Sequence, residues 1–247
     1  LTMSRGTRFT ATVDGQSYSF VNNSDVSIPP ASGVYKFSNL VIYEGSYLNY
    51  KYTANTSDID QRFIIPNDSV DTTTLTVKIQ TSSSDSSTRS YTLATGITGI
   101  DDTSEVYFLQ EVEGGRFEVY FGDGVMGKAI ADGNIVILDY INTNRDAPNG
   151  ASSFTLSGTI GGFTSATITT VSNAAGGTGL ESISSIKYNA PRDYSAQDRA
   201  VTAEDYKTLV KSIYANAQAV QVYGGEDAAV PDYGKVYISI KAKSGSN

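Results

Sequence analysis

The stretch Gly115-Arg-Phe-Glu-Val-Tyr-Phe-Gly-Asp-Gly-Val-Met-Gly-Lys-Ala-Ile-Ala-Asp-Gly-Asn-Ile-Val-Ile-Leu-Asp-Tyr140 holds two predicted strands, each entered through its own turn. The pair Gly114-Gly115 predicts a two-residue hairpin loop between strands over 106–113 and 116–121, because both loop positions tolerate positive φ. Within 116–121 apolar residues alternate with polar ones, which predicts one buried face formed by Phe117, Val119 and Phe121. Asp132-Gly133 predicts a second turn, and the strand that follows is apolar on both sides, as is typical of a strand covered on both faces.

The segment between these strands, Phe121-Gly-Asp-Gly-Val-Met-Gly-Lys128, has three glycines in six residues. A glycine-rich loop can hold phosphate when a helix opens behind it, usually after a Lys-Ser or Lys-Thr pair. Here a strand is expected to follow, and Lys128 precedes an alanine. We therefore interpret the glycines as a tight turn with a backbone conformation that only glycine adopts easily.

Composition excludes several classes of function. The chain of 247 residues has a formal net charge of −8 and contains neither cysteine nor histidine. An acidic surface repels nucleic acid and anionic membranes, so we expect neither as a partner. Without cysteine and histidine, Cys/His metal sites and Ser-His-Asp or Cys-His nucleophile systems are ruled out. The sequence also lacks an apolar run of the ~20 residues that a membrane-spanning helix needs.

The predicted fold class is mainly β with a C-terminal α+β module, multi-domain, with short antiparallel strands. Residues 1–80 are predicted to form one β domain, with a hairpin at Asp14-Gly15 and further strands at 35–44, 47–53 and 73–80. The polar segment 81–88 is either a domain linker or a long hairpin tip, and we interpret it as an exposed loop at a boundary. Residues 81–175 form a second β domain that carries the glycine-rich segment, with weak strands at 154–160 and 166–171.

Residues 176–247 are predicted to form the α+β module. A short helix over 182–188 is expected to stop at Pro191. A second helix begins after Thr202, whose side chain and that of Asp205 form a capping box, and Val201 is placed to pack on Tyr206. Strands are expected at 219–223 and 235–241.

Two separated motifs carry a resemblance to a known family. They are the glycine-rich segment followed by Asp132-Gly-Asn-Ile-Val-Ile-Leu-Asp-Tyr-Ile-Asn-Thr-Asn144, and the segment Asn189-Ala-Pro-Arg-Asp-Tyr-Ser-Ala-Gln-Asp-Arg-Ala-Val-Thr-Ala-Glu-Asp-Tyr-Lys-Thr-Leu-Val210. Together they resemble the baseplate J-like family of contractile-tailed phages, and within it the wedge proteins of T4-like phages. Relatives often have Asn-Gly where this chain has Asn144-Arg145. The residues matched to the family motifs are structural: Phe121, Gly122, Asp123, Gly124, Gly127, Arg199, Thr202, Asp205 and Tyr206.

The resemblance implies a non-enzymatic structural component of the virion, assembled in the host cytoplasm into the tail baseplate. It implies an inner baseplate ring formed by contacts with itself, as a dimer, and with other baseplate wedge subunits, together with a rearrangement that triggers sheath contraction. No catalytic residue, cofactor, metal or small-molecule substrate is implied. We expect this chain to be a C-terminal portion of such a protein.

Two alternatives stay open on the residues themselves. Calcium could bind at Asp101-Asp102 or at Glu226-Asp227, and a tail-associated hydrolase would use paired carboxylates, although solvated turns explain the acidic clusters as well. The clusters are Asp101, Asp102 and Glu105; Glu111 and Glu113; and Glu226, Asp227 and Asp232. A glycan-binding adhesin module would use tyrosine-rich strands and requires a concave, exposed aromatic cluster. The structural interpretation instead predicts that Tyr50, Tyr52, Phe117 and Phe121 are largely buried, and that Arg192 and Arg199 form internal ion pairs.

Overall fold

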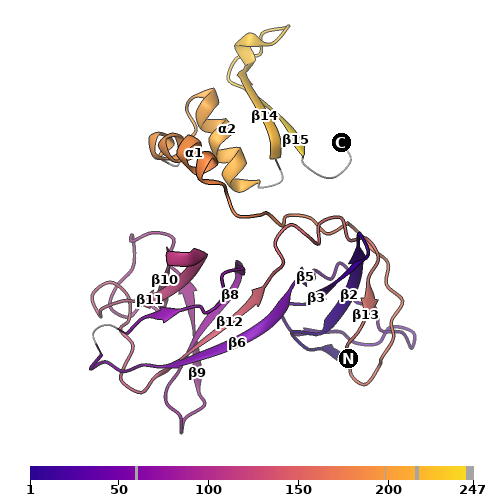
Figure 1. Ribbon diagram of the computed structural model, residues 1–247, viewed down its shortest axis with the longest axis vertical. Coiled ribbons are helices and arrows are strands. Elements are labelled where there is room, and N and C mark those ends of the chain that lie inside the picture. Colours follow the sequence, from indigo (N-terminus) through magenta and orange to yellow (C-terminus); the bar gives the residue numbers. More distant parts are fainter. Residues whose placement is uncertain (59–60, 198, 215–216, 243–247) are drawn as a thin grey trace. The chain divides into compact units, whose positions relative to one another are not determined.

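The computed structural model describes residues 1–58, 61–197, 199–214 and 217–242 (Figure 1). It is 37% strand and 13% helix, with both helices near the C-terminus, which confirms the predicted fold class. The chain divides into two compact units. The first comprises Leu1–Thr10, Tyr18–Asn144 and Thr155–Ile168, and the second comprises Ala11–Ser17, Arg145–Phe154 and Thr169–Asn247.

A seven-stranded sheet dominates the first unit, in the order β6-β12-β8-β9-β10-β11-β7. Its strands are β6 (Ser46–Thr53), β7 (Phe63–Ile64), β8 (Val70–Gln80), β9 (Thr88–Leu93), β10 (Val106–Val112), β11 (Arg116–Phe121) and β12 (Ile135–Asn142). Neighbouring strands are antiparallel except β9 and β10, which pair in parallel. Strand β12 lies between β6 and β8, and its residues 136–141 are all buried, as expected for a strand covered on both faces.

The hairpin of β10 and β11 forms as predicted, with a loop one residue longer. Val112 pairs with Arg116, so the loop is Glu113–Gly115. Gly114 and Gly115 have φ values of 78° and 70°, a region that residues with a Cβ rarely adopt.

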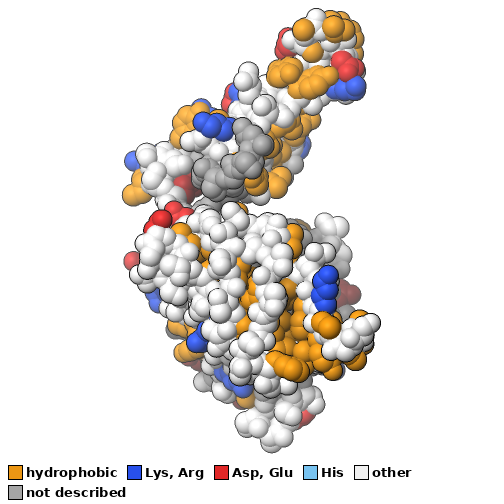
Figure 2. Space-filling model, turned by 90° about the vertical axis from the view of Figure 1, so that its right-hand side faces the viewer, with side chains coloured by type: hydrophobic (Ala, Val, Ile, Leu, Met, Phe, Trp, Pro, Cys, Tyr) orange, Lys and Arg blue, Asp and Glu red, His pale blue; other side chains and the backbone are white. Residues whose placement is uncertain are grey.

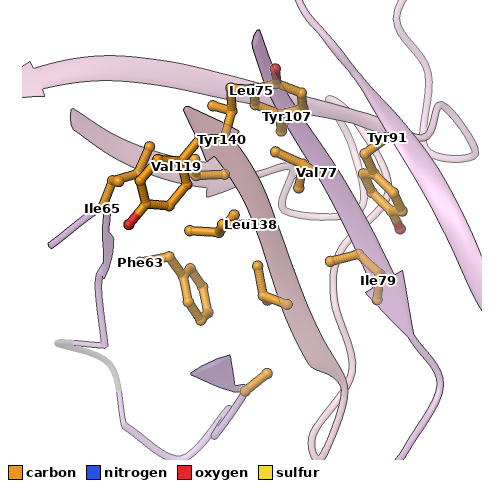
Figure 3. Close-up of a cluster of buried hydrophobic side chains, with 12 residues drawn as sticks. Phe63, Ile65, Leu75, Val77, Ile79, Tyr91, Tyr107, Val119, Leu138 and Tyr140 are labelled. Carbon is orange, nitrogen blue, oxygen red and sulfur yellow. The ribbon is translucent and has the colours of Figure 1, made fainter. Parts of the chain in front are cut away.

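The core of this unit is a cluster of twelve buried hydrophobic side chains (Figure 3). Val119, from β11, and Val136 and Leu138, from β12, are fully buried in it. Phe117, Phe121 and Tyr52 are partly buried and pack against the cluster, as the alternation predicts. The prediction was wrong for Tyr50, which is 40% exposed. Its strand β6 lies at the edge of the sheet, where one side of the strand has no neighbour to cover it.

The sheet includes strands from both sides of residue 80. Strands β8 and β9 pair directly, with Gln80 opposite Thr88, so the polar segment between them is a hairpin tip. Our interpretation of that segment as a boundary loop was therefore wrong. The division of the chain into domains at residues 80 and 175 remains a prediction. The seven-stranded sheet contains strands from both 1–80 and 81–175.

A four-stranded sheet has the order β13-β2-β3-β5, built from β13 (Thr155–Leu156), β2 (Arg8–Val13), β3 (Gln16–Val21) and β5 (Tyr43–Glu44). Beside it, β1 (Thr2–Met3) pairs with β4 (Val26–Ser27). The predicted turn between β2 and β3 is present, with φ values of 50° at Asp14 and 80° at Gly15. The strand expected at 35–44 is reduced to β5 and that at 154–160 to β13, while 166–171 contains no strand. The residues of 166–171 are mostly exposed, so no buried face favours a strand there.

Gly45 joins β5 to β6 and so links the two sheets. Its φ is 122°, and a Cβ at this position would lie 2.3 Å from the carbonyl oxygen of Asn142. Only glycine allows both that backbone conformation and that close approach. The chain can therefore leave the four-stranded sheet and enter the seven-stranded sheet within one residue.

The C-terminal part contains helices α1 (Ile183–Ala196) and α2 (Ala203–Ile213) and the antiparallel strands β14 (Ala217–Gly224) and β15 (Val236–Ala242). Helix α1 continues through Pro191, so the prediction that it stops there was wrong. Proline removes one helical N–H but has a φ close to that of a helix, and Ser195 donates its hydroxyl to the Pro191 carbonyl at 2.7 Å. No helix in the described residues is long and apolar enough to cross a membrane.

Candidate functional site

The glycine-rich segment forms a compact turn after β11. A Cβ on Gly122 would lie 2.2 Å from the carbonyl oxygen of Gly127, so no larger residue fits without moving the backbone. Gly124 and Gly127 both have φ values of 87°. The interpretation of these glycines as a tight turn is consistent with this geometry.

The carboxylate of Asp123 holds the turn from inside. One of its oxygens accepts hydrogen bonds from the backbone N–H groups of Val125 at 2.9 Å and Met126 at 3.0 Å. These bonds, that of Met126 first, hold the pKa of Asp123 below its ordinary value, because they favour the ionised carboxylate. The N–H of Gly124 meets the carbonyl of Gly127 at 3.0 Å.

The turn is also fastened to the loop that precedes β10. Gly127 donates its N–H to the carbonyl of Asp101 at 2.9 Å, and Lys128 donates to that of Ser104 at 2.9 Å. The Lys128 ammonium lies 3.0 Å from the Glu105 carboxylate. All the backbone N–H groups from residue 124 to 128 therefore have acceptors within the protein, and none of them is left to bind phosphate.

Two residues of the acidic cluster Asp101, Asp102 and Glu105 help to attach the glycine-rich turn to the loop before β10. Asp101 accepts hydrogen bonds from Ser104 and Thr103, which lower its pKa. Glu105 pairs with Lys128 and also with Arg89 at 3.0 Å, and its pKa is lowered by the hydrogen bond from Lys128 above all. Within the described residues there is no group of three acidic side chains placed to hold a metal ion. Asp101 and Glu105 thus act as turn caps and ion-pair partners.

The tip of the turn is apolar and exposed. Val125 is 72% exposed and Met126 is 41% exposed. Their backbone is fixed by Asp123 from one side and by the loop of Asp101 from the other. A fixed backbone loses little conformational entropy on binding, so this tip is suited to contact with another protein.

The second motif forms the start of helix α2. Thr202 accepts a hydrogen bond from the N–H of Asp205 at 3.2 Å, while the Asp205 carboxylate accepts one from the N–H of Thr202 at 2.8 Å. This is the predicted capping box. The bond from the Thr202 backbone is the main reason that the pKa of Asp205 is lowered. Tyr206 is half-buried, but Val201 is 78% exposed, so the predicted packing of Val201 on Tyr206 is not supported.

The two arginines of this region do not behave as predicted. Arg192 stacks on the ring of Tyr188, with its guanidinium carbon 3.6 Å from the ring centre. Arg199 donates to the side-chain oxygen of Gln197 at 3.1 Å. Neither arginine belongs to an ion pair of the described residues, so the expectation of internal ion pairs was wrong for this part of the chain.

A buried charged cluster was missed by the sequence analysis. Asp139, in the middle of β12, is only 4% exposed. Its carboxylate lies 3.1 Å from the Arg5 guanidinium and 3.5 Å from the Lys78 ammonium. Asn49 donates a hydrogen bond to it at 2.5 Å, the Tyr47 hydroxyl lies near enough to interact with it, and Arg5 stacks over the Tyr47 ring at 4.5 Å. The available signal was a single aspartate within an otherwise apolar strand.

Electrostatics keep this carboxylate ionised. Burial raises the pKa of Asp139, but the hydrogen bonds from Asn49 and Tyr47 and the charges of Arg5 and Lys78 outweigh burial and lower the pKa overall. Burial, together with the hydrogen bond to Asp139, raises the pKa of Tyr47 far above its ordinary value. The cluster ties Arg5, near the start of the chain, to the middle of strand β12 in the seven-stranded sheet.

Two cavities of the first unit bear on the hydrolase and glycan-binding alternatives, and neither cavity supports them. One, of about 380 Å³, is lined mainly by asparagine, serine and aliphatic side chains, with Phe37 and Tyr43 as its aromatic members. The other, of about 420 Å³, includes Arg5 and Arg8. Neither lining contains a carboxylate, so neither offers the pair that a glycosidase uses. The stacked pair Tyr223–Tyr237 is partly exposed, but it lies on a two-stranded sheet instead of in a hollow.

Comparison with known proteins gives two matches. Residues 202–247 match the family described as "Baseplate structural protein gp6, C-terminal domain I". The chain is also 27% identical, over an alignment of 271 residues, to the baseplate wedge protein gp6 of Enterobacteria phage T4. That alignment covers 99% of this chain and 39% of the T4 protein, so the chain spans well under half the length of this relative. Both matches support the resemblance carried by the two motifs.

Proposed function

We propose that this chain, as a gp6-like baseplate wedge protein, is a structural component of a phage tail baseplate. The sequence match to the T4 wedge protein along nearly the whole chain supports this role and a location in the virion tail. The family match at residues 202–247 also supports it, and that segment includes the capping box of α2.

One observation carries the proposal: the motif residues hold backbone shape. Gly122, Gly124 and Gly127 permit the turn, Asp123 caps it, and Thr202 with Asp205 caps a helix. Asp123, Thr202 and Asp205 thus use their polar side chains on the protein's own backbone. Residues that shape surfaces in this way suit a protein that acts through contacts with other proteins.

The finer part of the proposal concerns those contacts. The chain joins copies of itself and other baseplate wedge subunits into an inner ring, and its rearrangement takes part in triggering sheath contraction. The exposed tip at Val125 and Met126 is proposed as one contact with another wedge subunit, because it is apolar, rigid and exposed.

Sedimentation velocity of the chain, alone and mixed in turn with each of the other wedge subunits, tests this function. We expect co-sedimentation with at least one subunit. The variant Val125→Asp should weaken that complex by about tenfold or more, since a charge replaces an apolar contact. Val171→Asp is the matched control, because Val171 is 82% exposed and lies outside the turn, and it should bind normally. A chain that sediments unchanged with every wedge subunit would overturn the proposal.

A further inference from the structure

The segment 169–179, which precedes helix α1, is held with little help from apolar burial. It contains no charged residue, and most of its residues are exposed. Val171 is its largest apolar side chain and is 82% exposed. White atoms, which are backbone and uncharged polar side chains, also cover much of the face shown in Figure 2. Hydrogen bonds are therefore the main interactions that can fix this segment.

The partner of this segment is the loop before β13, which belongs to the same compact unit. The N–H of Gly150 donates to the carbonyl of Ala174 at 2.7 Å, and Ala174 donates its own N–H to the carbonyl of Ala151 at 2.8 Å. Thr170 adds a bond from its hydroxyl to the carbonyl of Ser152 at 2.6 Å. The two stretches of chain therefore lie side by side through hydrogen bonds.

Asn149, in the same loop, binds the segment through both ends of its carboxamide. Its Nδ2 donates to the carbonyl of Gly177 at 2.8 Å, and its Oδ1 accepts from the N–H of Gly177 at 3.1 Å. A Cβ on Gly177 would lie 2.1 Å from the carbonyl oxygen of Arg145, so this close approach requires glycine. Because α1 begins at Ile183, Asn149 fixes the chain six residues before that helix.

Asn149 and Gly150 also form the only Asn-Gly pair in the sequence. Asparagine before glycine is prone to deamidation, because glycine has no Cβ to shield its backbone nitrogen. That nitrogen attacks the side-chain carbonyl carbon of asparagine, ammonia leaves, and a succinimide ring forms, which water then opens to aspartate or isoaspartate. Here the attacking nitrogen donates to Ala174 and the carboxamide is bound to Gly177. The reaction therefore requires these hydrogen bonds to open first.

We propose that Asn149 is a latch on the segment 169–179, and that deamidation of Asn149 makes the opening of this latch permanent. Aspartate has no N–H to return to the Gly177 carbonyl, and its negative charge repels that carbonyl oxygen. Isoaspartate also lengthens the backbone by one methylene group, which shifts the loop against Ala174. The latch involves this chain alone, so it can be tested without any wedge subunit and apart from the proposed function.

Deamidation of the unsubstituted full chain gives the first test. The chain is incubated in mildly alkaline buffer, with and without guanidinium chloride, and the peptide containing Asn149 is followed by mass spectrometry. Deamidation should be at least about tenfold slower in the folded chain, because only the open fraction reacts. Gly177→Ala should raise the folded rate about tenfold, because the added Cβ displaces the Gly177 backbone from Asn149. Equal rates in the folded and unfolded chain, or an unchanged rate in Gly177→Ala, would refute the latch.

Hydrogen exchange in Asn149→Asp measures release of the segment. The amide hydrogens of Ala174 and Gly177 should exchange about tenfold faster than in the original chain, since the bond from Asn149 to the Gly177 carbonyl is lost. Asn173→Asp is the matched control, because it adds the same charge at an exposed position of the same segment, and both amides should stay slow in it. Peptides from β12 and α2 should be unchanged in both variants. Equal exchange in the two variants, or faster exchange throughout the Asn149→Asp chain, would overturn the proposal.

Discussion

Neutralising Asp139 is the perturbation that most directly tests how the seven-stranded sheet is held. Asp139→Asn keeps the shape of the side chain but leaves Arg5 and Lys78, at 3.1 Å and 3.5 Å, without their counter-charge. Removing one partner from a buried ion pair costs ~3 kcal/mol or more, because the remaining charge is left uncompensated. The sheet of β6, β12 and β8 should lose about that much stability.

Hydrogen exchange followed by mass spectrometry gives a local readout. Peptides from β12 should exchange ~100-fold faster in Asp139→Asn, the factor that corresponds to ~3 kcal/mol when exchange requires opening of the sheet. Peptides from α2 serve as the internal control and should be unchanged. Arg5→Ala should be costly in the original chain and much less so when Asp139 is already asparagine.

The pH dependence provides a second check. The pKa of Asp139 is lower in the folded protein than in the unfolded chain. The stabilisation from the carboxylate is therefore fully present above the unfolded pKa of about 3.9, and it is lost as the pH falls through the folded pKa. The difference between the original chain and Asp139→Asn should persist at pH 5 and shrink below about pH 4. Equal exchange rates in the two proteins at pH 7, or fully additive effects with Arg5→Ala, would refute the reasoning.

Three further substitutions have expected outcomes. Gly122→Ala should destabilise the first unit by about 3 kcal/mol in urea unfolding, because the added Cβ overlaps backbone atoms. Gly96→Ala is the control and should be nearly neutral, because a Cβ there meets no atom within 4 Å. Equal effects of the two substitutions would contradict the steric argument. Thr202→Ala should cost about 1 kcal/mol of α2 stability through loss of the cap, measured by exchange of α2 peptides, while Thr208→Ala inside the helix should cost nothing. Tyr140→Phe should lower the free energy of unfolding in urea by about 1–2 kcal/mol, because the hydroxyl of this buried side chain donates a hydrogen bond to Asn67 at 2.6 Å. An unchanged unfolding midpoint would show that this bond is dispensable.

The sequence by itself determined the elements whose cause is local. The burial of β12 on both faces follows from a run of apolar residues, and the β10–β11 hairpin follows from Gly114-Gly115. The capping box of Thr202 and Asp205 depends on residues three apart, and its geometry was predicted correctly. The glycine-rich segment was predicted to be a turn, although its hydrogen bond from Gly127 to the carbonyl of Asp101 was not predicted.

Tertiary structure alone decided which strands became neighbours. Pairing of β8 with β9 turned an apparent boundary into a hairpin tip, and the edge position of β6 left Tyr50 exposed. The charge of Asp139 is balanced by Arg5 and Lys78, which lie far from it in the chain. Side-chain periodicity records whether a strand has a buried face, but it does not record which strand covers that face. That choice is made by packing and backbone pairing between distant segments, and it depends on the whole fold.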